Sequence, residues 1–168
     1  MARTRKPVVP GWFTETGDGR DPADFRLLGT RCRVCGAVFF PREDFFCRDP
    51  GCDGTELTEV PLSPRGTVWS YTDGRYRPPP PYVSDPEVPW QPRTLIAVEL
   101  AAERMVVLGQ AAPGVRVADL RVGMAAELVP GVLGGEDEGE DAETVWTTWW
   151  WRPVDRAGTD AAGGGRDR

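Results

Sequence analysis

The chain has 168 residues, a formal net charge of −6 at pH 7, and high contents of glycine and proline, with 20 and 17 residues. This length fits one compact domain, and the glycine and proline content favours strands and loops over helices. The negative charge disfavours nucleic acid as a partner, because neutralisation of phosphates supplies much of that affinity. Histidine is absent and Lys6 is the one lysine, which excludes a Ser-His-Asp triad and a histidine-ligated metal within these residues.

The longest apolar runs are too short to cross a bilayer, and no apolar stretch follows the basic first residues. We therefore expect a cytoplasmic protein that makes no contact with a membrane. General acid-base chemistry would fall to Asp, Glu or Tyr side chains, or to a partner protein. Because no paired-carboxylate motif supports an enzyme of its own, we expect no catalytic residue in the chain.

The chain divides into four predicted regions. The first has mixed charge with proline and glycine, and reads as an extended arm anchored by Trp12 and Phe13. The second contains every cysteine, the third contains the segments rich in β-formers, and the last is small, polar and predicted to be disordered. These regions are residues 1–24, 25–61, 62–153 and 154–168.

Four cysteines lie close together in the second region: Cys32, Cys35, Cys47 and Cys52. Their spacing is Cys-x2-Cys, eleven residues, then Cys-x4-Cys. The first pair, followed by Gly36, is typical of a metal-binding knuckle, and Pro50 and Gly51 favour a turn within the wider second pair. Four thiolates complete the tetrahedral shell of Zn²⁺, so the predicted site is structural. Two disulfides, four unrelated thiols and a rubredoxin-like iron site are the alternatives. A reducing cytosol disfavours disulfides, the close clustering of the four cysteines disfavours unrelated thiols, and the wide second pair disfavours iron.

Five segments of the third region are rich in β-formers, which predicts a small barrel that is closed or nearly closed. They are residues 65–73, 94–100, 104–110, 124–130 and 144–152. Residues 74–92 contain seven prolines and are predicted to form a long loop that carries Tyr76, Tyr82 and Trp90. The acidic, glycine-rich residues from Gly134 to Glu143 are predicted to be a solvated loop.

The last predicted strand is crowded with tryptophan. Because successive strand residues face opposite ways, Trp149 and Trp151 are predicted to share one face, and Trp146 and Trp150 the other. One face can fill the barrel. The other must lie against the ribbon, the arm or a partner, and a fully intramolecular core is the alternative.

The order of these pieces resembles a known family, in which an N-terminal rubredoxin-like zinc ribbon precedes an OB-fold barrel. The matching pieces are Leu-Leu-Gly-Thr-Arg-Cys-Arg-Val-Cys-Gly at 27–36, Phe-Phe-Pro-Arg at 39–42, Leu-Ser-Pro-Arg-Gly-Thr-Val-Trp-Ser-Tyr-Thr at 62–72 and Leu-Arg-Val-Gly-Met at 120–124. The resemblance spans roughly residues 25–153. It implies a mainly β protein with a five-stranded OB-fold barrel and structural Zn²⁺.

Members of that family are accessory to thiolase-like, sterol-carrier-type acyl-CoA enzymes. The resemblance therefore implies a non-catalytic subunit that binds and stabilises a thiolase or an acyl-CoA aldolase in a hetero-oligomer. Breakdown of steroid side chains, or of fatty acyl-CoA, is the implied process. Contacts with the partner, or with acyl-CoA at the interface, are expected from the exposed aromatics Tyr76, Tyr82, Trp90, Trp149 and Trp151. A single-stranded nucleic-acid-binding protein is the alternative, because zinc ribbons and OB barrels often bind single strands.

Overall fold

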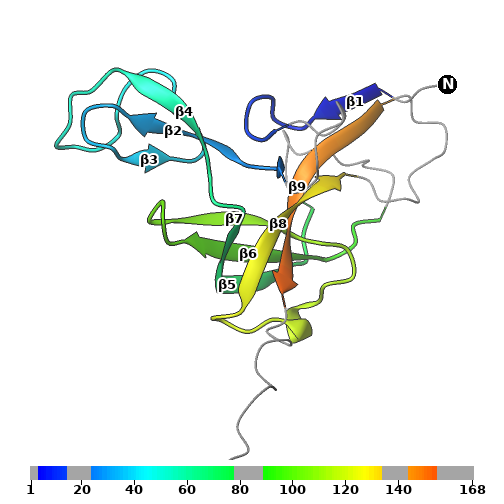
Figure 1. Cartoon of the computed structure of the whole chain (residues 1–168). Coiled ribbons are helices and arrows are strands. Elements are labelled where there is room, and N and C mark those ends of the chain that lie inside the picture. Colours follow the sequence, from blue (N-terminus) through cyan, green and yellow to red (C-terminus); the bar gives the residue numbers. More distant parts are fainter. Residues whose placement is uncertain (1–3, 15–23, 78–88, 134–143, 155–168) are drawn as a thin grey trace, which may run out of the picture.

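The computed structural model describes residues 4–14, 24–77, 89–133 and 144–154. A three-stranded ribbon projects from one end of a β-barrel, and the N-terminal arm runs beside the last barrel strand (Figure 1). Among the described residues, no helix has the length and apolar content needed to span a membrane. The prediction of a mainly β protein is confirmed.

The barrel is built from five strands, β5 (Arg65–Gly74), β6 (Arg93–Leu100), β7 (Met105–Ala111), β8 (Ala125–Val132) and β9 (Thr144–Val154). Strands β5, β6 and β7 form an antiparallel meander, and β9 then pairs in parallel with β7. Strand β8 pairs antiparallel with both β9 and β5, which closes the ring. This is the predicted five-stranded OB-fold barrel, and the five predicted strands agree with it to within about two residues at each end.

A short 3-10 helix, η2 (Val117–Asp119), lies between β7 and β8, where the sequence predicts a turn or short helix. The barrel interior is filled by alternate residues of the strands. Val68, Ile96, Val98 and Leu100 are each 0% exposed, and so is Trp151. Most of the predicted 74–92 loop and the whole acidic segment from Gly134 to Glu143 lie outside the described residues.

The ribbon is a separate antiparallel sheet in which β2 (Leu28–Cys32) lies between β3 (Val38–Phe39) and β4 (Leu57–Pro61). The base of the ribbon, where the chain enters at Phe25 and Leu27 and leaves at Leu62, belongs to the same apolar cluster as the barrel. These three side chains are 3%, 0% and 1% exposed. The backbone N–H of Leu62 donates to the carbonyl of Leu27 at 2.8 Å, which joins the two chain segments at the base of the ribbon.

The N-terminal arm forms one element that the sequence does not predict. Its strand β1 (Thr4–Pro7) pairs in parallel with β9, with Thr4 opposite Thr144. The predicted anchors are confirmed: Phe13 is 3% exposed, and the Trp12 ring lies 5.4 Å from that of Phe40. The arm therefore connects the ribbon to the barrel.

Candidate metal centre

The first cysteine pair lies where β2 turns into β3. Cys32 is the last residue of β2, and its carbonyl accepts a bond from the N–H of Gly36 at 2.9 Å. Gly36 has φ = 78°, in the left-handed region that glycine adopts without strain. The tight turn that results brings the Cys35 side chain back beside Cys32, as the spacing predicts.

The second pair is held by a turn of the kind that its sequence indicates. The N–H of Cys52 donates to the carbonyl of Asp49, and the N–H of Gly51 donates to Asp49 Oδ1, both at 2.9 Å. The N–H of Cys47 donates to the carbonyl of Gly54 at 2.8 Å. The two extra residues of the wider pair are thus taken up in the turn at Pro50 and Gly51.

These two turns bring all four sulfur atoms together, each within 4.8 Å of the others. Cys32 Sγ lies 3.7 Å from Cys52 Sγ, and Cys35 Sγ lies 3.5 Å from Cys47 Sγ. A tetrahedral Zn²⁺ with bonds of about 2.3 Å places its sulfurs about 3.8 Å apart, whereas a disulfide joins them at about 2.05 Å. The four residues fit Zn²⁺, and all four cysteines are free. A tetrathiolate leaves no open position, so the zinc would supply structure and no chemistry.

The electrostatic environment differs among the thiols before metal binding. Hydrogen bonding from the backbone of Cys35 lowers the pKa of the Cys32 thiol to about 7. Burial raises the pKa of the Cys47 thiol to about 12. Metal binding therefore has to displace a proton held firmly at Cys47, while Cys32 is the readier thiolate.

Gly54 is a positioning residue of this centre that the sequence does not single out. A Cβ at residue 54 would lie 2.7 Å from Cys32 Sγ and 3.3 Å from Cys52 Sγ. The distance to Cys32 Sγ is too short for atoms that do not bond, and the distance to Cys52 Sγ is tight, so a side chain at residue 54 would push the Cys32 sulfur out of place.

We predict that Gly54→Ala weakens zinc binding by about 10- to 100-fold, the usual cost of disturbing the residues that orient metal ligands. A competition titration with a chromogenic chelator measures this. Gly51→Ala is the matched control, because a Cβ there meets Asp49 Oδ1 at an ordinary 3.4 Å. Equal zinc affinities for the two variants would contradict the prediction.

The predicted aromatic contact residues lie in two different environments. Trp149 and Trp151 share the inner face of β9, as the alternation predicts, and both pack on the core. Trp151 is 0% exposed, so its ring has no surface to offer a partner in this structure. Trp149 is half-buried beneath the rings of Phe13 and Phe40, at 5.8 and 6.0 Å. The inner face thus packs on the barrel core, the arm and the ribbon.

Two of the predicted loop residues, Tyr76 and Trp90, lie near Gly74, at the end of β5 opposite to Arg65. Tyr76 is 73% exposed. The indole N–H of Trp90 donates to the carbonyl of Gly74 at 3.1 Å, and the Arg93 guanidinium lies 5.5 Å from the centre of the Trp90 ring. Tyr82 lies outside the described residues. Tyr76 and Trp90 thus remain candidate contact residues.

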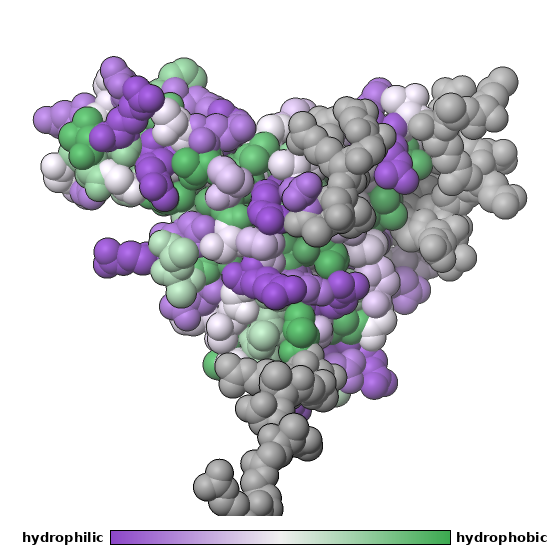
Figure 2. All heavy atoms as spheres, in the orientation of Figure 1, coloured by the Kyte–Doolittle hydropathy of each residue, from purple (hydrophilic) through white to green (hydrophobic). Residues whose placement is uncertain are grey.

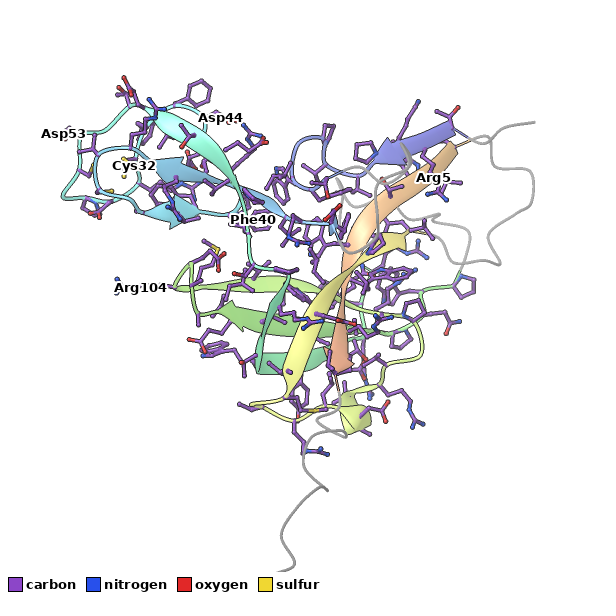
Figure 3. The ribbon with its side chains drawn as sticks, in the orientation of Figure 1. Arg5, Cys32, Phe40, Asp44, Asp53 and Arg104 are labelled. Atoms are coloured by element: carbon purple, nitrogen blue, oxygen red, sulfur yellow. The ribbon has the colours of Figure 1, made fainter. Side chains whose placement is uncertain are left out.

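The ribbon carries exposed aromatics beside its second cysteine pair that sequence reasoning missed. Phe45 and Phe46 directly precede Cys47 and are 79% and 59% exposed. Figure 3 shows Cys32 and Asp53 toward the end of the ribbon away from the barrel, and Phe40 at the junction with the barrel. The adjacent Phe-Phe pair was the available signal, because a module held together by metal has little core to bury two large rings.

Comparison with known proteins agrees with this architecture. Residues 21–58 match the domain family described as "ChsH2, rubredoxin-like zinc ribbon domain". A 73-residue stretch is 39% identical to the benzoylsuccinyl-CoA thiolase subunit BbsA of Thauera aromatica, covering 41% of this chain and 46% of that protein. The chain thus matches about half the length of that curated relative.

Two solved structures align with the chain. The Ltp2-ChsH2(DUF35) aldolase aligns with a TM-score of 0.51 and 23% identity, covering 76% of this chain and 84% of that one. A DUF35-family protein of unknown function from Sulfolobus solfataricus aligns with a TM-score of 0.39 and 18% identity, covering 77% and 76%, which is too distant to carry an argument.

The fold and the four-cysteine centre define this chain as a zinc-ribbon protein with an OB-fold barrel. Residues 21–58 are similar to the ChsH2 rubredoxin-like zinc ribbon, and the shared fold agrees with the resemblance drawn from the sequence. The metal that this domain family binds is zinc, in agreement with the tetrathiolate geometry.

Proposed function

We propose that this chain is an accessory, non-catalytic subunit of a thiolase-like acyl-CoA enzyme, either a thiolase or an aldolase, in the cytoplasm. The observation that carries the proposal is the 39% identity to a thiolase subunit over 73 residues. The ribbon family and the shared fold with a protein of an aldolase complex support it.

The chemistry of the chain supports the same role. Among the described residues, the group of side chains able to hold a metal is the tetrathiolate, whose ligand shell is closed. The chain has no histidine and one lysine, so it is poor in the groups that most often act as bases or nucleophiles. The catalytic groups would therefore come from the partner, and this chain would complete or stabilise the partner's acyl-CoA site.

We also propose that the end of the barrel around the loop after β5 faces the acyl-CoA. Tyr76 is exposed there, and Arg93 pairs with the face of Trp90. An arginine guanidinium recognises phosphate, and aromatic faces stack on bases, so this combination suits the nucleotide part of a coenzyme A thioester. Steroid side-chain thioesters are the substrates that the resemblance implies, and fatty or aromatic acyl-CoA thioesters are the alternatives.

The proposal is tested by co-expression with the thiolase-like protein of the same organism. We expect stable co-elution as a hetero-oligomer, and a partner that is insoluble or inactive when expressed alone. Independent elution of the two proteins, with full activity of the enzyme alone, would refute the proposed function. A salt-dependent mobility shift of this chain with a single-stranded oligonucleotide would instead support the nucleic-acid alternative.

A further inference from the structure

The ribbon presents three exposed apolar side chains in or next to its cysteine pairs, which we call the ribbon tip. Val34, Phe45 and Phe46 are 72%, 79% and 59% exposed. In Figure 2 the ribbon is largely hydrophilic, with hydrophobic residues showing among the polar ones toward its outer end. Large exposed apolar groups on a small rigid module mark a surface that a partner covers.

The fold of the described residues does not bury these three apolar side chains. None of them belongs to the core cluster, and none packs against it. They are nevertheless held close to the metal centre: a Cβ on Gly54 would meet Val34 Cγ2 at 3.1 Å, and Gly54 accepts the backbone bond from Cys47, which follows Phe46. The ribbon tip is therefore pre-organised by the two cysteine turns, which lowers the entropy lost on binding.

The tip is also negatively charged. Each cysteine pair contains one arginine, and each is already neutralised: Arg33 pairs with Glu56 at 3.5 Å, and Arg48 pairs with Glu43. Asp49 and Asp53, in and just after the second pair, form no ion pair within the described residues. A zinc tetrathiolate adds a formal charge of about −2 nearby. The partner surface that complements the tip is therefore apolar and basic.

An open recess beside the metal centre supplies the geometry for such a contact. It is lined by Phe46, Cys47, Arg48, Asp49, Pro50, Cys52 and Asp53. The Arg48 cation is paired with Glu43, so the carboxylates of Asp49 and Asp53 are the charges of the lining without an ion pair among the described residues. A lysine or arginine side chain of a partner entering this recess would place its cation near both carboxylates and beside the Phe46 ring. Ion pairing and a cation–π contact would both favour its binding.

We propose that the ribbon tip docks into an apolar recess ringed by lysine or arginine on the thiolase-like partner subunit, with one basic side chain of the partner seated between Phe46 and the two carboxylates. This inference rests on the proposed function and deepens it by naming the contact surface. The ribbon then acts as a rigid, metal-stabilised contact module, and the barrel end near Tyr76 remains free for the acyl-CoA.

The test uses the full zinc-loaded chain and the purified partner subunit in a binding titration. The double variant Phe45→Ala/Phe46→Ala is expected to raise the dissociation constant by about 30-fold or more, as loss of interface hot spots does. Zinc content and melting temperature should stay unchanged, because both side chains are exposed. Trp69→Ala is the matched control: Trp69 is 60% exposed on the barrel, and we expect less than threefold change.

Charge is tested in the same titration. Asp49→Asn/Asp53→Asn is expected to weaken binding and to flatten its salt dependence, whereas Glu99→Gln, on the exposed face of β6, should change neither. Asparagine at 49 retains Oδ1 as the acceptor for Gly51. Wild-type affinity of the Phe45→Ala/Phe46→Ala variant would refute docking through the ribbon tip while leaving the proposed function intact. Loss of binding by Trp69→Ala would then place the contact on the barrel face. Failure of the unmodified chain to bind at all would refute both.

Discussion

Replacement of Cys35 by serine is expected to abolish stoichiometric zinc binding and to unfold the ribbon. The ribbon sheet has two strands of five residues and one of two, which is too small to form a core that holds it alone. In such modules the metal supplies the folding free energy, about 10 to 16 kcal/mol at pH 7 in isolated zinc-finger peptides. A serine hydroxyl does not replace a thiolate ligand, and the three remaining sulfurs would repel one another when ionised.

The effect of losing the zinc should reach the barrel, because the ribbon's Phe40 packs edge-on against Trp149 at 6.0 Å. We therefore expect a changed tryptophan fluorescence and a lower melting temperature, together with loss of zinc by elemental analysis. Val34→Ala is the control within the same turn; Val34 is exposed and should retain full zinc. A Cys35→Ser protein with full metal content and an unchanged melting curve would refute the tetrathiolate.

Replacement of Trp151 by alanine is expected to lower the free energy of unfolding by about 3 to 5 kcal/mol, the usual cost of removing a fully buried aromatic ring. Among the residues that the structure describes, Trp151 is the largest side chain that is fully buried, and it lies in the barrel core beside Gly109. Urea denaturation followed by circular dichroism measures the change, with an unchanged m-value if the transition stays two-state.

The same substitution at Trp69 separates burial from residue type. Trp69 lies on β5 at an irregularity in the pairing with β6, and it is 60% exposed. We expect Trp69→Ala to change the free energy of unfolding by less than about 0.5 kcal/mol. If the two variants were equally destabilised, the assignment of Trp151 to the core would be wrong.

Local sequence patterns were sufficient to predict the ribbon and the barrel. Cysteine spacing with Gly36, Pro50 and Gly51 predicts both metal turns, because these residue types are common in tight turns and Gly36 adopts a positive φ. The five barrel strands follow from β-formers separated by turn residues. The alternation of Trp149 and Trp151 onto one face follows from the two-residue period of a strand.

Features that depend on distant parts of the chain could not be predicted in this way. Strand β1 has a charged sequence ending in Pro7, and it forms because the edge of β9 is available beside it. The packing of the inner face of β9 requires a glycine on another strand: a Cβ at Gly109 would lie 2.8 Å from Trp151 and 2.9 Å from Trp149. The missing side chain makes room for both rings, and nothing local to β9 indicates it.

The exposed ribbon tip escaped prediction for a similar reason. A Phe-Phe pair beside a metal ligand reads equally well as a small core or as a contact surface. Burial distinguishes the two, and burial depends on the ribbon projecting away from the barrel (Figure 1). The same geometry leaves Trp149 covered by the arm and the ribbon.

Reconstitution of activity tests the central claim most directly, namely that this chain is a required subunit that supplies no catalytic group. The purified thiolase-like partner would be assayed for acyl-CoA cleavage alone and with increasing amounts of the zinc-loaded chain. We predict little activity from either protein alone, and activity that rises with added chain until it saturates at a fixed ratio of the two. Full activity of the partner without this chain, or turnover by this chain alone, would contradict the claim.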